Sequence, residues 1–128
     1  MAFKKKIMIC DDDAGIVNML EMLLEFAGDY SVESDTDSLH IHEKLLTEKP
    51  DLLLVDLWMP VVSGDQVIKR VRETRELAYL PIIAISASPD GEQIALDAGA
   101  DLFLAKPFDM DEILAKLDHY LHEEDQQI

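Results

Sequence analysis

The sequence is poor in cysteine, glycine, proline and positive charge, and it contains no long hydrophobic run. Its 128 residues include one cysteine, five glycines, five prolines and 11 Lys+Arg against 27 Asp+Glu, which gives a formal net charge of −16. The single cysteine, Cys10, excludes an intramolecular disulfide and favours a reducing compartment. The excess of negative charge excludes the usual basic nucleic-acid-binding surface. The apolar run after the N-terminal lysines stops at Asp11, too early for a signal peptide or a membrane span, so we expect a cytoplasmic protein.

The remaining composition is that of a folded globular chain. Hydrophobic residues make up 48% of the sequence and charged residues 30%, which is unlike a disordered or fibrous protein. No linker rich in glycine, serine or proline interrupts the chain. We therefore expect one domain, residues 1–122, followed by a short polar tail, residues 123–128.

Short apolar segments alternate with segments of helical periodicity. The predicted strands are residues 6–10, 30–33, 52–55, 81–86 and 102–105. The predicted helices are residues 14–27, a segment capped by Ser38 that ends at 48 or 49, residues 64–75, residues 91–98 and a last helix capped by Asp109. Five strand–helix units in a chain too short for an eight-unit barrel predict an open, doubly wound α/β sheet with parallel strands.

Polar residues suited to phosphate chemistry stand where these strands end: Asp11, Asp12, Asp13, Asp56, Ser86 and Lys106. Ligands of doubly wound sheets bind beyond the carboxyl ends of the strands, so we expect these side chains on one rim. Several carboxylates there would repel one another unless a divalent cation and a lysine offset their charge. Magnesium suits carboxylate and phosphate oxygens. The pattern predicts phosphoryl transfer to a carboxylate, with an aspartyl phosphate as product.

Four segments in the right order and spacing together resemble the receiver domains of two-component response regulators: IMICDDD, LLLVDLWMPVVSG, PIIAISAS and GADLFLAKPF. The resemblance covers essentially the whole chain. It implies a flavodoxin-like (βα)5 fold whose five-stranded parallel sheet has the order 2-1-3-4-5. It also implies a signalling switch, which catalyses only its own phosphorylation and slow dephosphorylation.

The resemblance assigns the acceptor and the metal ligands. Asp56 matches the phosphoacceptor. Asp11 and Asp12, together with Asp56 and the main-chain carbonyl of Trp58, match the ligands of Mg²⁺, for which Mn²⁺ is an alternative.

The resemblance also assigns the residues that contact phosphate and relay its presence. Ser86 and Lys106 match the phosphate-contacting pair, and Ser86 with Phe103 match the switch pair. These would change the face formed by residues 91–98, residues 102–105 and the last helix. Ser86 stands where many members have threonine, and Phe103 where many have tyrosine. Pro107 matches a proline preceded by a cis peptide bond.

The implied phosphodonor is a sensor histidine kinase or a histidine phosphotransfer protein. Downstream, the resemblance implies an effector protein or a covalently linked output domain, without direct contact to nucleic acid or membrane. The sequence leaves open whether the domain acts alone or belongs to a larger regulator or hybrid kinase, and whether phosphorylation makes it dimerise.

Two other functions share parts of the pattern. A haloacid-dehalogenase-like phosphohydrolase would use Asp11 as nucleophile and Asp13 as acid and base, although Gly15 stands where that motif usually has threonine or valine. A flavin carrier would need a phosphate-binding loop after the first strand, which the sequence lacks. Among the remaining residues, we expect a buried Cys10 and solvated charges at Arg70, Arg72 and Arg75.

Overall fold

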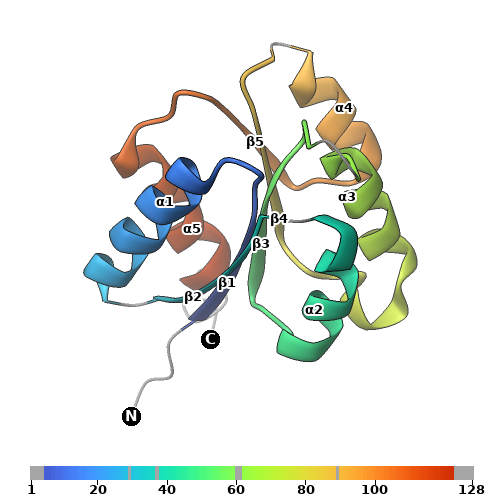
Figure 1. The fold of residues 1–128 in the computed structure, drawn as a ribbon, viewed down its shortest axis with the longest axis horizontal. Helices are drawn as coiled ribbons and strands as arrows, with labels where there is room; N and C mark the ends of the chain where they lie inside the picture. Colours follow the sequence, from blue (N-terminus) through green and yellow to red (C-terminus); the bar gives the residue numbers. More distant parts are fainter. Residues whose placement is uncertain (1–4, 29, 37, 60–61, 89, 123–128) are drawn as a thin grey trace.

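The computed structural model describes residues 5–28, 30–36, 38–59, 62–88 and 90–122. They form a five-stranded sheet with helices on both faces (Figure 1). The strands are β1 (Lys5–Cys10), β2 (Tyr30–Asp35), β3 (Leu52–Asp56), β4 (Ile82–Ser86) and β5 (Leu102–Ala105). The helices are α1 (Ala14–Ala27), α2 (Ile41–Glu48), α3 (Gly64–Glu73), α4 (Gly91–Ala98) and α5 (Met110–His122). All neighbouring strands are parallel and their order is β2-β1-β3-β4-β5, which confirms the predicted fold class.

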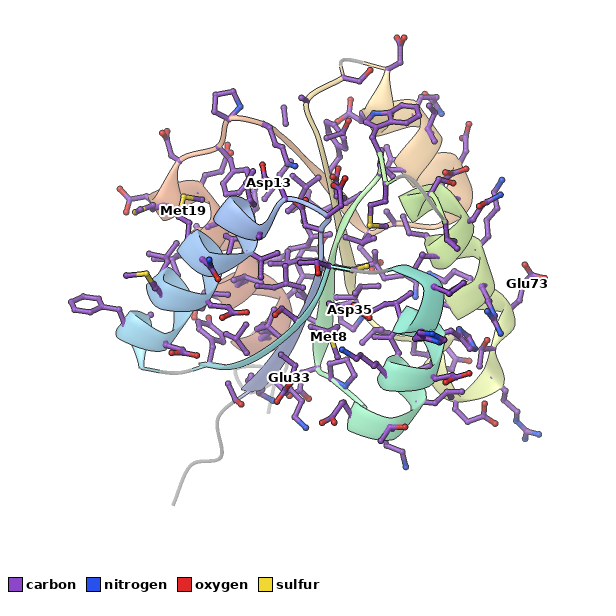
Figure 2. The ribbon with its side chains drawn as sticks, viewed as in Figure 1. Met8, Asp13, Met19, Glu33, Asp35 and Glu73 are labelled. Carbon is purple, nitrogen blue, oxygen red and sulfur yellow. The ribbon has the colours of Figure 1, made fainter. Side chains whose placement is uncertain are left out.

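The sheet separates two hydrophobic cores. Helices α1 and α5 cover one face, and α2, α3 and α4 cover the other (Figure 1). Alternate residues of β1 supply the two cores, because successive side chains of a strand point to opposite faces. Ile7 and Ile9 pack on the side of α1 and α5, whereas Met8, labelled in Figure 2, and Cys10 pack on the side of α2, α3 and α4. The burial of Cys10 confirms the prediction.

Two boundaries differ by two residues from those predicted, whereas one end each of β1, β3 and β4 differs by a single residue. Strand β2 continues to Asp35 instead of stopping at residue 33, because its polar end still pairs with β1 up to Cys10. Helix α3 ends at Glu73 instead of residue 75, since Thr74 has an extended backbone. A separate 3₁₀ turn, Arg75–Leu77, follows and places Leu77 in the core.

The predicted cap of the second helix is also wrong. Ser38 begins a 3₁₀ turn, Ser38–His40, and α2 begins at Ile41. His40 stands at the N-cap position and makes no side-chain capping bond. Asp109, by contrast, does precede the last helix, where its carbonyl accepts a hydrogen bond from the Ile113 N–H.

Arg72 is not a solvated charge, contrary to the prediction. Its guanidinium donates hydrogen bonds to the main-chain oxygens of Gly99 (2.8 Å), Ala78 (3.0 Å) and Leu80 (2.7 Å) and to the Asp101 carboxylate (2.9 Å). One side chain thus connects the end of α3 to the start of β4 and to the turn between α4 and β5.

Within the described ranges, no helix combines the length and the apolar character that crossing a membrane requires.

Candidate functional site

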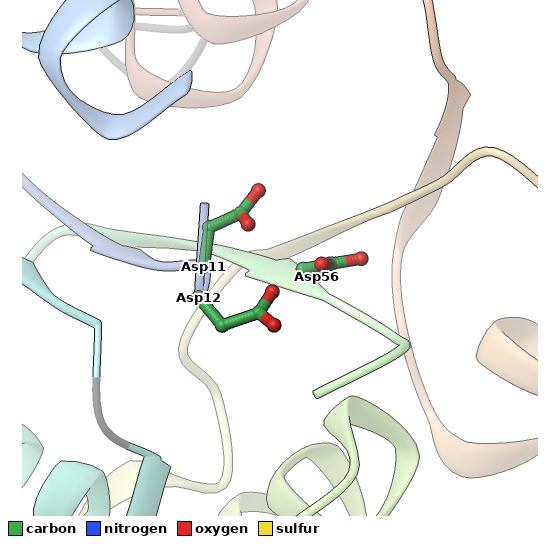
Figure 3. A group of neighbouring side chains, drawn as sticks. All are labelled: Asp11, Asp12 and Asp56. Atoms are coloured by element: carbon green, nitrogen blue, oxygen red, sulfur yellow. The ribbon is translucent and has the colours of Figure 1, made fainter. Parts of the chain in front are cut away.

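Three carboxylates meet at the carboxyl edge of the sheet. Asp11 and Asp12 follow β1, and Asp56 is the last residue of β3. One oxygen from each lies within 4.8 Å of the others, and Figure 3 shows the three side chains pointing into the same space. Asp11 and Asp56 are buried, whereas Asp12 is exposed. β1 and β3 pair in register up to Cys10 and Val55, so the next residues, Asp11 and Asp56, are held side by side.

Lys106 reaches this group from the end of β5. Its Nζ lies 3.1 Å from Asp11 Oδ2 and 3.5 Å from Asp56 Oδ2. The peptide bond between Lys106 and Pro107 is cis. When all four groups are ionised, three carboxylates and one ammonium carry a net charge of −2. The site therefore has an excess of negative charge that a divalent cation would balance.

The pKa of the Asp56 carboxyl reflects this excess of negative charge. Burial, and next the charge of Asp11, raise the pKa of the Asp56 carboxyl from 3.8 to about 6. The Lys106 ammonium and the hydrogen bond from the Trp58 N–H to Asp56 Oδ1 (3.3 Å) oppose this rise in pKa. Carboxylate oxygens are the ligands that hard cations prefer. The donor set, its excess charge and its spacing thus fit a divalent metal ion.

Ser86 and Phe103 lie next to each other. Ser86 ends β4 and is fully buried, and its Oγ accepts a hydrogen bond from the Ser88 N–H (3.0 Å). The Phe103 ring on β5 is partly buried against the core on the side of α2, α3 and α4. Gly91, the first residue of α4, touches both: a Cβ at this position would lie 2.9 Å from Ser86 Cβ and 3.0 Å from Phe103 Cε1. Gly91 joins the two switch candidates to α4.

Two glycines, Gly64 and Gly91, stand at the site although the sequence motifs assign no site role to them. A Cβ on Gly64 would lie 2.7 Å from Leu57 Cα and still closer to the main-chain oxygen of Asp56. Gly64 therefore allows α3 to begin directly against the backbone of Asp56 and Leu57. No sequence signal distinguishes such a close approach from a glycine needed for a turn.

Asp13 does not join the carboxylate cluster. Its Oδ1 accepts hydrogen bonds from the N–H groups of Gly15 (2.9 Å) and Ile16 (3.3 Å), so it caps the N-terminus of α1. The Asp13 N–H in turn donates to Asp11 Oδ1 (3.0 Å) and orients that carboxylate. A capping role leaves Asp13 poorly suited to the acid and base function that a dehalogenase-like hydrolase would need.

Comparison with known families and sequences agrees with this geometry. The family model described as response regulator receiver domain matches residues 7–118. The response regulator MprA of Mycobacterium avium is 37% identical over 114 residues, which are 88% of this chain and 49% of MprA. The DNA-binding dual master transcriptional regulator RpaA of Synechocystis is 34% identical over 88% of this chain and 47% of its own length. The chain thus spans about half the length of these relatives.

Solved structures give the same result. The chemotaxis protein CheY4 of Vibrio cholerae superposes with a TM-score of 0.85 at 30% identity, covering 93% of this chain and 100% of CheY4. The receiver domain of the sensor histidine kinase PA1611 of Pseudomonas aeruginosa has a TM-score of 0.84 at 25% identity, covering 93% of this chain and 98% of that domain. That structure holds a magnesium ion in its active-site cleft.

Proposed function

The chain belongs to the family of response regulator receiver domains, and we propose that it is a switch in which Asp56 accepts a phosphoryl group from a histidine kinase or a histidine phosphotransfer protein. Members of this family serve two-component signalling as switches rather than as enzymes with turnover. The observation that carries the proposal is the position of Lys106, whose Nζ lies within 3.5 Å of Asp56 Oδ2 and 3.1 Å of Asp11 Oδ2.

In the proposed reaction, an Asp56 carboxylate oxygen attacks the phosphorus of a phosphoimidazole. The new O–P bond forms as the P–N bond breaks, and the imidazole nitrogen takes the electron pair. The Trp58 N–H fixes Asp56 Oδ1, and the Lys106 ammonium stands beside Oδ2. A phosphate oxygen would replace a carboxylate as the partner of Lys106.

Receiver domains bind a divalent metal through an acidic cluster of this kind. We assign Mg²⁺, with Mn²⁺ as a substitute, to Asp11, Asp12, Asp56 and the main-chain carbonyl of Trp58. A bound cation supplies positive charge next to the oxygens of the transferred group. Asp12 is exposed and Asp11 is held by two hydrogen-bonding partners, so this chain contributes one exposed and one fixed carboxylate.

Ser86 and Phe103 are our candidates for relaying the phosphorylated state. To contact phosphate, the Ser86 hydroxyl must give up the hydrogen bond from the Ser88 N–H. A shift of Ser86 acts on α4, because Gly91 has no side chain to keep the two apart. Space vacated by Ser86 is available to the Phe103 ring. The proposed output is a changed face of α4, β5 and α5.

We propose two downstream partners for this face. One is a covalently linked output domain, since MprA and RpaA are about twice the length of this chain. The other is a separate effector protein. We place the protein in the cytoplasm, which is supported by its single, buried cysteine.

The test is phosphorylation by acetyl phosphate with Mg²⁺, followed by intact-protein mass spectrometry. We expect one added phosphoryl group on the wild type and on Asp111→Asn, a matched change of an exposed aspartate in α5. Asp56→Asn should gain none. A phosphoryl adduct that persists in Asp56→Asn would overturn the assignment.

A further inference from the structure

A cavity of about 300 Å³ lies at the edge of the sheet where the strands begin, opposite the carboxylate cluster. It opens between the turn that leads from α2 into β3 and the segment that leads from the 3₁₀ turn into β4 (Figure 1). Its volume is at the lower end of the range of small-molecule sites. Its lining residues include Lys49, Pro50, Glu76, Leu77, Tyr79 and Leu80. None of them takes part in the proposed phosphoryl transfer.

Opposite charges line this cavity without pairing. In the part of the chain that the structure describes, no ion pair joins the Lys49 ammonium to the carboxylate of Asp51 or Glu76, although all three residues line the cavity. Asp51 is engaged elsewhere, because its Oδ2 accepts a hydrogen bond from the Lys6 N–H (2.7 Å). Lys49 and Glu76 are both exposed. A ligand that carries one charge of each sign satisfies the two side chains together.

The remaining wall of the cavity is apolar. Leu77 and Leu80 are 5% and 8% exposed, and each reaches the cavity from the core. The ring of Tyr79 is 95% exposed, so an apolar group that covers it removes both surfaces from water. The wall therefore suits an aliphatic or aromatic side chain.

Hydrogen bonds fix the backbone on both sides of the cavity. On one side, the Lys49 N–H donates to the carbonyl oxygen of Leu45 (3.0 Å) at the end of α2. On the other side, Arg72 Nη1 donates to the carbonyl oxygens of Ala78 (3.0 Å) and Leu80 (2.7 Å), which flank Tyr79. A ligand therefore need not order the surrounding chain, which lowers the entropic cost of its binding.

We propose that this cavity binds a small zwitterionic amino acid with an apolar side chain. The carboxylate of the ligand pairs with the Lys49 ammonium, its ammonium pairs with the Glu76 carboxylate, and its side chain covers Tyr79. A zwitterion also escapes the repulsion that a net charge of −16 exerts on anions. The site is separate from Asp56, and the inference does not rest on the proposed function.

The experiment is an NMR titration of the isotope-labelled protein with L-leucine and with analogues that each lack one part of it. The amide chemical shifts of Lys49, Asp51, Leu77 and Tyr79 report binding at the cavity. We expect L-leucine to bind with a dissociation constant on the order of 1 mM. Glycine lacks the apolar side chain and should bind about tenfold more weakly, as for burial of part of a leucine side chain.

Two further analogues test the charges. N-acetyl-L-leucine lacks the ammonium, and L-leucinamide lacks the carboxylate. Each should bind about three- to fivefold more weakly than L-leucine at neutral pH, the range for an ion pair at an exposed position.

Variants assign each charge of the ligand to its partner. Lys49→Gln should remove the difference in affinity between L-leucine and L-leucinamide, because the carboxylate then has no partner. Glu76→Gln should likewise remove the difference between L-leucine and N-acetyl-L-leucine. Lys69→Gln and Glu73→Gln are matched controls on α3, outside this cavity, and should keep both differences; Figure 2 labels Glu73. All four positions are exposed, so the variants should fold, and their amide spectra check this.

Several results would overturn the site. These are chemical shifts that do not saturate with L-leucine, glycine that binds as tightly as L-leucine, and analogues without one charge that bind as tightly as L-leucine. Differences among the ligands that survive in both Lys49→Gln and Glu76→Gln would overturn it too. None of these results bears on Asp56 as the acceptor, which phosphorylation of Asp56→Asn tests separately.

Discussion

The Asp56 carboxyl is destabilised in its ionised form by the burial that holds it at the end of β3. It is 5% exposed, and its pKa is raised from 3.8 to about 6. The folded protein therefore binds a proton on the Asp56 carboxyl more tightly than the unfolded chain does. The contribution of Asp56 to the free energy of unfolding is fully present below pH 3.8 and is lost as the pH rises through about 6.

Asp56→Asn should therefore stabilise the metal-free protein at neutral pH. We expect the free energy of unfolding at pH 7.5 to rise by about 1–3 kcal/mol, because the amide is never ionised. The difference from wild type should shrink as the pH falls from about 7 to 4. Urea denaturation in a chelating buffer, followed by the fluorescence of the single tryptophan Trp58, measures it.

Asp111→Asn, an exposed control, should show no such pH-dependent gap. A wild type as stable as Asp56→Asn at every pH would contradict the cost assigned to the buried charge.

Cys10 is a second residue whose chemistry follows from its place. It is fully buried, and burial, with the nearby charges of Asp35, Asp11 and Asp56, raises the pKa of its thiol to about 12. Native Cys10 should react with iodoacetamide at pH 8 at least about a thousandfold more slowly than in concentrated urea, since the thiolate is both scarce and inaccessible. Mass spectrometry of the labelled protein measures this. Rapid labelling of the native protein would show that β1 opens far more readily than its packing indicates.

Among the helices, α3 and α4 depend on one side chain that links them. Arg72 donates hydrogen bonds to main-chain oxygens on both sides of β4 and ion-pairs with Asp101 at 2.9 Å. Asp101 Oδ2 also accepts from the Ile82 N–H at 2.8 Å, so the start of β4 belongs to the same network. The αL conformation of Gly99 (φ 118°) brings its carbonyl and Cα against this arginine.

Removal of the Arg72 side chain should therefore destabilise the protein strongly, although this side chain lies near the surface. We expect Arg72→Ala to lower the free energy of unfolding by about 2–4 kcal/mol, because three main-chain oxygens lose their donor. Arg72→Lys should show a large part of this destabilisation, since an ammonium cannot reproduce the planar fork of the guanidinium. Arg75→Ala, an exposed control on the following turn, should stay within about 0.5 kcal/mol. Urea denaturation of the wild type and the three variants measures these free energies of unfolding. Equal effects of Arg72→Ala and Arg75→Ala would contradict the linking role.

For the molecule as a whole, the net charge of −16 and the acidic site both favour the binding of a cation. A cation that binds only the folded state stabilises it by mass action. We expect Mg²⁺ at ten times its dissociation constant to add about 1.4 kcal/mol and to raise Tm on the order of 5 °C. Asp12→Asn removes an exposed carboxylate that we propose as a ligand, breaks no buried contact, and should lose this increment.

Calorimetry at constant ionic strength isolates the specific effect, because NaCl screens the surface charge equally in both proteins. If Mg²⁺ raised the Tm of Asp12→Asn as much as that of wild type, the metal site would lie elsewhere.

Short-range patterns were sufficient for the strands, most of the helices and the list of polar residues at strand ends. Period-2 and period-3.6 repeats arise within a few residues, so they survive in the linear sequence. They failed at the end of β2, where polar residues still form a strand because β1 pairs with them, and at Arg72, whose partners lie up to 29 residues away.

The sequence by itself determined the (βα)5 architecture and the identity of the chemical groups, because repeats and motifs are local. Only the tertiary structure decided which groups touch. Lys106 meets Asp11 across 95 residues of chain, Gly64 and Gly91 owe their importance to close approaches, and the cavity beside Tyr79 exists only between two turns. Such contacts depend on how whole helices pack on the sheet, and side-chain packing of this kind is a property of the folded molecule rather than of any segment.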